Sequence, residues 1–154
     1  FIGIPGSWRR QRLLQRVRED LARRNITLTV HDGSRGFLHG DALVRYVNRC
    51  RVLLNILKHP EDSVWHRLLL GGANGALVVT EPLADYGAFE PGTHLVAAPV
   101  DEIADRVAFF LEREDRRREI ADRSYRFVTT ELHIGASIAH VLERWEAAHG
   151  AHVS

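Results

Sequence analysis

Two apolar stretches, Val52-Leu53-Leu54-Asn55-Ile56-Leu57 and Ala76-Leu77-Val78-Val79-Thr80, decide the fold of this chain. Continuous apolar runs of this length are typical of strands that are buried on both faces of a parallel sheet. The segment between them has a helix start signal at Asp62-Ser63, helical character to about residue 74, and a stop signal at Gly75. A strand, a helix and a second strand in this order predict a right-handed parallel crossover.

Strand and helix signals alternate on both sides of this unit. Further strands are expected at residues 1–4, 26–31 and 93–98. Further helices are expected at residues 8–24, from Gly40-Asp41 onward, and at 101–113, 115–131 and 136–148. The pattern predicts an α/β fold, namely a Rossmann-like three-layer α/β/α domain with a parallel sheet of about five strands and consecutive C-terminal helices.

The length of 154 residues suits one domain, which we expect over residues 1–149, with a frayed tail at 150–154. The sequence has no Met and starts at Phe1, so we expect a domain cut from a longer protein. No apolar run reaches the roughly 18 residues that a membrane-spanning helix needs. The single cysteine, Cys50, excludes an internal disulfide framework and is expected to be a buried small hydrophobe.

The charge balance gives no case for a nucleic-acid partner, because the net charge is only +1. Arginine nevertheless greatly outnumbers lysine, since Lys58 is the only lysine in the sequence. Arginine binds phosphate through a bidentate fork, so this bias would suit a phosphate site. The coding composition of a GC-rich genome is the simpler explanation.

The first strand-to-helix loop contains Gly3, Gly6 and Ser7. Ligands of parallel sheets bind beyond the carboxyl ends of the strands, and this loop is expected there. Backbone N–H groups at a helix N-terminus can receive a phosphate or a carboxylate. The spacing matches neither a dinucleotide-binding fingerprint nor a Walker A loop, and a plain tight turn explains the same residues more simply.

The loop after the strand at 52–57 holds the densest group of ionisable residues, and its candidate ligand-binding residues are His59, Ser63 and Arg67. Arg67 is placed to reach a diphosphate bound at the start of the following helix. A polar surface loop, with Arg67 paired to a nearby acid, is the alternative, and the sequence leaves both open.

Two acids follow the later apolar strand, Glu81 directly and Glu90 within a further turn. Each is a candidate for hydrogen bonds to sugar hydroxyls, or for capping a loop. His59 and His66 are seven residues apart, which is not a metal-ligand spacing, so no metal site is predicted. The sequence also lacks a nucleophile-elbow motif, and no catalytic residue is assigned.

From Gly36 onward the order of features resembles the C-terminal donor-binding domain of GT-B glycosyltransferases (glycosyl transferases group 1), most closely those that include the CgeB-like spore-maturation proteins. The resemblance is carried by four ordered stretches that cover about three quarters of the chain. They are residues 40–55 (GDALVRYVNRCRVLLN), 67–81 from Arg67 to Glu81, 89–92 (FEPG), and the consecutive helices expected from Asp101 onward.

The resemblance implies one half of a two-domain enzyme that transfers a sugar from a nucleotide-sugar donor to an unknown acceptor. It implies no metal or other cofactor, and a missing N-terminal domain of the same chain that binds the acceptor. Arg67 matches the family's Arg ahead of a small-residue helix, and Gly75 matches the Gly before the next strand. A cytoplasmic location is expected, with peripheral binding to the inner membrane left open.

One position departs from the family pattern. The family commonly has a Glu three residues after its Arg, and Leu70 stands there in this chain. The resemblance therefore leaves an alternative open, a catalytically inactive domain that kept the fold and binds a nucleotide or a protein partner.

Overall fold

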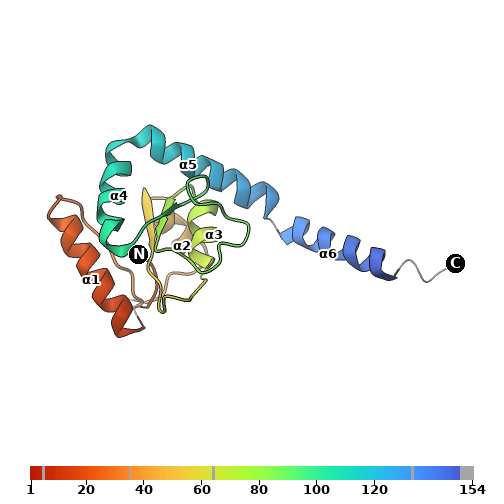
Figure 1. Cartoon of the computed structure of the whole chain (residues 1–154), viewed down its shortest axis with the longest axis horizontal. Helices are drawn as coiled ribbons and strands as arrows, with labels where there is room; N and C mark the ends of the chain where they lie inside the picture. Colours follow the sequence, from red (N-terminus) through yellow and green to blue (C-terminus); the bar gives the residue numbers. More distant parts are fainter. Residues whose placement is uncertain (5, 35, 64, 133, 150–154) are drawn as a thin grey trace.

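A computed structural model describes residues 1–4, 6–34, 36–63, 65–132 and 134–149. At its centre lies a parallel sheet of three strands, β1 (Val52–Asn55), β2 (Leu77–Thr80) and β3 (Val96–Ala97), in the order β1-β2-β3 (Figure 1). Val52 is level with Leu77, and Val79 is level with Val96. The two stretches that decided the fold are thus the paired parallel strands β1 and β2.

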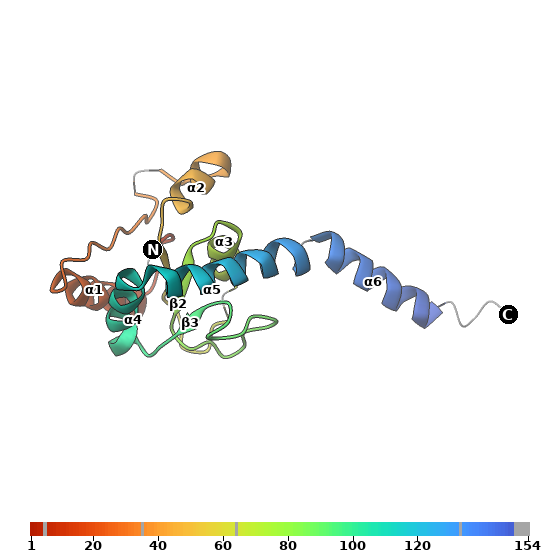
Figure 2. The same ribbon diagram turned by 90° about the horizontal axis from the view of Figure 1, so that it is seen from above.

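Helices cover both faces of the sheet, as Figure 2 shows from above. In chain order the helical elements are α1 (Trp8–Ala22), α2 (Gly40–Val47), α3 (His66–Ala73), α4 (Val100–Glu112), α5 (Glu114–Arg126), the π-helical η1 (Phe127–Glu131) and α6 (Ile134–His149). None of the described helices is both long enough and apolar enough to cross a membrane.

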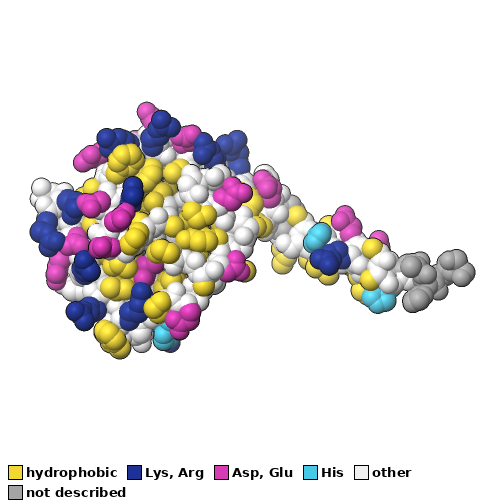
Figure 3. Space-filling model, in the orientation of Figure 1, with side chains coloured by type: hydrophobic (Ala, Val, Ile, Leu, Met, Phe, Trp, Pro, Cys, Tyr) yellow, Lys and Arg dark blue, Asp and Glu magenta, His cyan; other side chains and the backbone are white. Residues whose placement is uncertain are grey.

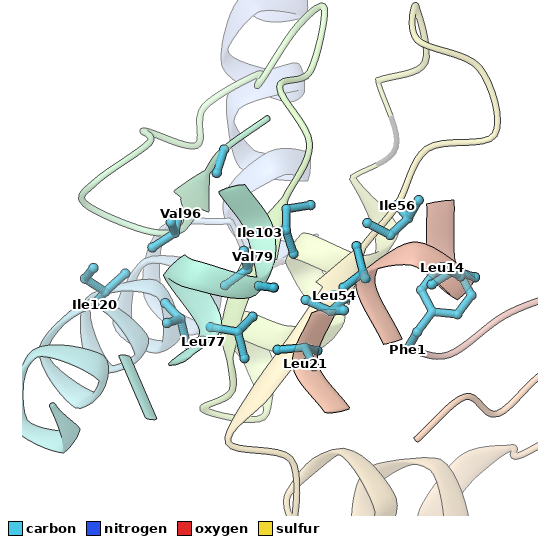
Figure 4. Packing of buried hydrophobic residues seen from close by; sticks show 14 residues of the cluster. Phe1, Leu14, Leu21, Leu54, Ile56, Leu77, Val79, Val96, Ile103 and Ile120 are labelled. Carbon is cyan, nitrogen blue, oxygen red and sulfur yellow. The ribbon is translucent and has the colours of Figure 1, made fainter. Parts of the chain in front are cut away.

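The alternation of side chains along the strands explains the three layers. Leu54 and Val79 point to one face, where they pack with Leu14 of α1 and Ile103 of α4 (Figure 4). The neighbouring strand residues point to the opposite face, where α2 and α3 pack. Because period-two alternation puts successive side chains on opposite faces, both faces of these strands are apolar. The predicted three-layer α/β architecture is confirmed.

The sheet is smaller than the predicted five strands. Residues 1–4 and 26–31 pair with each other through a single parallel bridge, Ile2 with His31, and do not join the sheet. Two backbone hydrogen bonds of 2.9 Å support the bridge, from Gly3 N to the His31 carbonyl and from His31 N to the Phe1 carbonyl. The Ile2 carbonyl instead accepts from the Arg67 side chain, so it is not available to a strand ladder.

Element boundaries differ from expectation at three other places. The third helix begins at His66 rather than near residue 62, because Asp62 accepts the His59 N–H in a local turn and Ser63 accepts the Asp85 N–H. The predicted helix over residues 115–131 is divided into α5 and the π-helical η1. The predicted strand at 93–98 is reduced to β3. The expected frayed tail at 150–154 lies outside the described residues.

Two glycines let α3 pack closely against its neighbours. A Cβ atom on Gly71 would lie 2.3 Å from Cγ2 of Val78 in β2. A Cβ on Gly72 would lie 2.7 Å from Oγ of Ser124 in α5. The small-residue helix end in the sequence is therefore explained by close packing against both the sheet and α5.

Replacing Gly71 with Ala tests this packing. Helix propensity alone would stabilise the variant by up to about 1 kcal/mol. Overpacking of a core typically costs about 1–3 kcal/mol, so we expect a net fall in the free energy of unfolding. Urea denaturation measures it, with Ala73→Ser as the control, because that change also adds one atom but at an exposed position of α3. Equal stability of the two variants would contradict the close approach.

Candidate functional site

The carboxyl ends of β1 and β2 meet the start of α1 at one edge of the sheet. Ser7 caps α1, since its Oγ accepts the Arg10 N–H at 3.2 Å. The same hydroxyl donates to the Lys58 carbonyl at 3.2 Å. The loop before α1 is therefore fixed to the loop after β1, and the N-terminal turn of α1 faces the edge where ligands of parallel sheets bind.

Glu81 connects three segments at this edge. Its Oε2 pairs with Nη2 of Arg9 at 2.6 Å, and its Oε1 accepts the Leu57 N–H at 2.7 Å. Arg9 also donates through Nη1 to the Leu57 carbonyl at 3.0 Å. The carboxylate is buried, so its negative charge depends on these donors for compensation. The pair fastens the first turn of α1 to the ends of β1 and β2.

Arg67 enters the same edge from α3. Its side chain is 4% exposed and lies over the Phe1 ring, with Cζ 4.6 Å from the ring centroid. Nε donates to the Ile2 carbonyl at 2.9 Å, and Nη1 donates to Oδ1 of Asn55 at 3.1 Å. Burial, with a smaller contribution from Arg10, lowers the pKa of Arg67 to about 10. The guanidinium stays charged at neutral pH inside the domain.

Arg67 belongs to a polar network across the strand ends. Asn55 Nδ2 donates to Oγ1 of Thr80 at 3.0 Å, and that hydroxyl donates to the Glu81 carbonyl at 2.8 Å. Asn55 and Thr80 are fully buried. Buried polar groups of this kind must be hydrogen-bonded, and a connected network gives each strand end a defined position.

Arg10 is the second buried guanidinium of the cluster, at 7% exposure. Nη1 donates to the Ile4 carbonyl at 3.1 Å, while Nε is buried and has no hydrogen-bond partner among the described residues. Burial lowers its pKa, and the nearby carboxylates of Asp62 and Glu81 oppose that shift. The side chain therefore keeps an unused donor inside the cluster.

His66 is the first residue of α3 and interacts electrostatically with both buried arginines, Arg67 and Arg10. Its pKa is lowered, first by burial and then by the positive charges of Arg67 and Arg10. A lowered pKa keeps His66 neutral at pH 7. The smaller part of this shift shows that the positive charges of Arg67 and Arg10 act on the first residue of α3.

A family model described as glycosyl transferase-like matches residues 9–146 of this chain. The chain belongs to this family. Its elements are also similar to the crystal structure of a glycosyltransferase from Rickettsia africae ESF-5, with a TM-score of 0.71 and 10% sequence identity. That match covers 95% of this chain and 47% of the other, so the chain spans about half the length of that protein. A comparison with curated proteins gives no match.

At 10% identity the structural match shows the fold alone, and that fold is half of a glycosyltransferase. The resemblance inferred from the sequence is thereby confirmed for the family and for the α/β half-fold. Within the described part of the glycosyl transferase-like domain, no group of three or more His, Cys, Asp or Glu is placed to hold a metal ion.

The structure brings five of the eight expected site residues to the same edge. A Cβ on Gly3 would lie 2.5 Å from Nη2 of Arg67, and Gly3 has φ +127°, so only glycine suits this close approach. Gly6 also has a positive φ, of +67°, in the exposed part of this loop. Ser7, Arg67 and Glu81 complete the group through the contacts described above.

The other three expected residues have local roles. The His59 N–H donates to Oδ2 of Asp62 at 2.9 Å, and Ser63 Oγ accepts the Asp85 N–H at 2.9 Å. Glu90 is exposed, and its N–H donates to Nδ1 of His94 at 3.1 Å. Within the described ranges, no hydrogen bond or ion pair connects Glu90 to the arginine cluster. The amides near Ser63 do not begin a helix, so the expectation of a helix N-terminus there was wrong.

Three residues of the cluster were not among the predicted site residues, namely Arg9, Arg10 and Asn55. Arg9 and Arg10 directly follow the helix cap Ser7, and that position was the available signal in the sequence. Asn55 interrupts an apolar strand, which indicates a buried polar role. Sequence alone could not show that these side chains converge, because Arg9 and Glu81 are 72 residues apart.

Leu70, where the family commonly has Glu, packs in an apolar cluster with Val47, Leu53 and Ala76. This cluster lies between α2 and the sheet rather than among the arginines. A carboxylate at this position would lie among apolar groups, which disfavours its charged form. In this glycosyl transferase-like domain the Leu70 side chain therefore contributes to packing.

Replacing Glu81 with Gln tests the role of the buried pair. The change keeps the shape of the side chain but removes the negative charge opposite Arg9. It also places an amide NH2 group, which is a donor, against the N–H donors of Arg9 or Leu57. Breaking a buried ion pair costs about 3–5 kcal/mol, and partial exposure of Arg9 reduces this to roughly 2–3 kcal/mol of unfolding free energy. Glu102→Gln is the matched control, because Glu102 pairs with Arg106 on the exposed surface. A similar loss of unfolding free energy in both variants, measured by urea denaturation, would contradict a stabilising role for the buried Arg9–Glu81 pair.

Proposed function

We propose that this domain binds the diphosphate of a nucleotide-sugar donor at the edge formed by Ser7, Arg9, Arg10 and His66. The observation that carries the proposal is the buried Arg10, whose Nε has no hydrogen-bond partner among the described residues and which lies in a cluster with Arg9 and Arg67. A diphosphate is the part of such a donor that this chemistry recognises, since arginine forms charge-assisted hydrogen bonds to phosphate oxygens.

The start of α1 adds to this positive field. The first turn of a helix presents N–H groups without intrahelical partners, and the helix dipole is positive there. Ser7 occupies the cap position and fixes the loop through Lys58. During sugar transfer the diphosphate becomes the leaving group, and fixed positive groups at this place would stabilise its developing charge.

Arg67 is assigned to the diphosphate by the family resemblance, but its environment favours a different contribution. It is 4% exposed and already bonded to Ile2 and Asn55. We therefore assign it a positioning role, in which it holds the Gly3–Ser7 loop against the strand end. Glu81 would likewise act through Arg9. Glu90 has an exposed side chain, and a role near the ribose or sugar stays a prediction for it.

The complete reaction would need a second domain. The matched glycosyltransferase is about twice as long as this chain, so the chain corresponds to one half of such an enzyme. We propose that residues 1–149 form the donor-binding half and that the other half binds most of the acceptor. On this account, the isolated domain binds the donor without completing a transfer.

A catalytically inactive binding domain is the second candidate. The observation that favours it is Leu70, which is packed where the family commonly has Glu. Under this alternative the domain keeps the fold and binds either a nucleotide or a protein partner, without turnover.

Calorimetric titration of the chain with a panel of nucleoside diphosphates tests the proposal. We expect at least one to bind, and we expect Arg10→Gln to weaken that binding by at least tenfold. Arg12→Gln is the control, because Arg12 lies on the exposed side of the same helix. Thermal melting checks that each variant is folded.

Two results would contradict the proposal. If no nucleoside diphosphate binds, the donor site is excluded and a protein-binding role is favoured. If Arg10→Gln and Arg12→Gln bind equally well, Arg10 does not contact the ligand.

A further inference from the structure

The backbone of Lys58 is fixed at the edge where the diphosphate is proposed to bind. The Ser7 hydroxyl donates to the Lys58 carbonyl at 3.2 Å, and the same oxygen accepts the Arg10 N–H at 3.2 Å. A single hydroxyl group therefore joins the backbones of two cationic residues that are distant in the sequence. Because Ser7 is the cap of α1, Lys58 lies beside the first turn of that helix.

The residue before Lys58 is held from both sides of the chain. The Leu57 N–H donates to Oε1 of Glu81 at 2.7 Å, and the Leu57 carbonyl accepts from Nη1 of Arg9 at 3.0 Å. Leu57 packs in the apolar cluster on the α3 side of the sheet, whereas Ile56 packs in the cluster formed with α1 and α4. Period-two alternation from Ile56 assigns the Lys58 side chain to the α1 side.

None of these contacts uses the Lys58 ammonium group. The residue is exposed, and among the described residues its ammonium forms no hydrogen bond or ion pair. Glu61 and Asp62 follow in the same loop, but Asp62 accepts the His59 N–H at 2.9 Å instead. A fixed backbone that carries a free cation lowers the ordering cost of binding an anion, because only the side chain has to be placed.

The cations near this edge come mainly from α1. Figure 3 shows Lys and Arg side chains gathered over that helix, whose position is given by Figure 1. Of those in its first turn, Arg9 is paired with Glu81 and Arg10 is buried. Residues 58–63, which follow β1, contain one lysine or arginine, Lys58. An anion at the cap of α1 would therefore have one free cation beside it on the β1 side.

We propose that the Lys58 ammonium is a further contact for the diphosphate, on the β1 side of the α1 cap, with Arg10 on the α1 side. The inference rests on the proposed function, since it names another residue of the same site. A lysine ammonium is a compact charge on a flexible stem, whereas the arginine fork is planar and rigid. Lys58 can thus reach a phosphate that the buried Arg10 does not contact.

Lys58→Gln tests the proposal by calorimetric titration with the nucleoside diphosphate that binds best. The change removes the charge and keeps the carbonyl that Ser7 uses, so the fold should be retained. We expect binding to weaken by about fivefold to tenfold, as for one charge-assisted hydrogen bond at an exposed position. Lys58→Arg should retain most of the affinity.

Arg51→Gln is the matched control. It removes the same charge from an exposed residue at the opposite, amino-terminal end of β1, so it should leave the affinity unchanged. Thermal melting checks that every variant is folded.

The ammonium can also be observed directly, because Lys58 is the only lysine. Reductive methylation with isotope-labelled formaldehyde marks this amine and the amino terminus, and methylation keeps the charge. Lys58→Gln identifies the Lys58 methyl signal by its loss from the NMR spectrum. We expect that signal to move during the titration and to saturate at the affinity that calorimetry gives.

The outcomes separate this inference from the proposed function. If Arg10→Gln weakens binding but Lys58→Gln binds as tightly as Arg51→Gln, Lys58 is not a ligand contact and the proposed function stands. A Lys58 signal that stays in place at saturation has the same meaning. If no nucleoside diphosphate binds, both proposals are overturned.

Discussion

The buried guanidinium of Arg67 is the interaction on which the candidate site depends. It links the amino-terminal segment to β1, because it donates to both the Ile2 carbonyl and the Asn55 side chain. A buried cation is costly unless its hydrogen bonds are satisfied, so these two acceptors and the Phe1 ring determine where the segment can lie. The position of Gly3 follows directly, since any side chain there would collide with Arg67.

Two further sets of contacts, between segments that are distant in the sequence, complete the site. Ser7 both caps α1 and bonds to the loop after β1. Glu81 then joins the first turn of α1 to the strand ends through Arg9 and Leu57. The consequence is an edge at which three arginines, Arg9, Arg10 and Arg67, outnumber the two acids Glu81 and Asp62. Preorganised positive charge of this kind is what binding of a diphosphate requires.

The sequence predicted those parts of the fold that have a local signal. The runs at 52–57 and 76–80 identified β1 and β2, and regular apolar spacing identified α1, α4 and α6. Residues 1–4 and 26–31 had the composition of strands, yet the side chain that takes the Ile2 carbonyl lies 65 residues away. The sequence likewise placed Arg67 near the site but could not show its burial, which depends on tertiary packing.

The proposed account, in which the domain holds a donor by its diphosphate, rests on membership of the glycosyl transferase-like family and on the arginine cluster at the sheet edge. The most direct measurement is a map of amide chemical shifts in the isotope-labelled chain during titration with the nucleoside diphosphate that binds best. The account predicts that the largest changes fall on the amides from Ser7 to Arg10 and on His66. Largest changes around the hollow lined by Leu69 and Phe89, or no change at all, would contradict it.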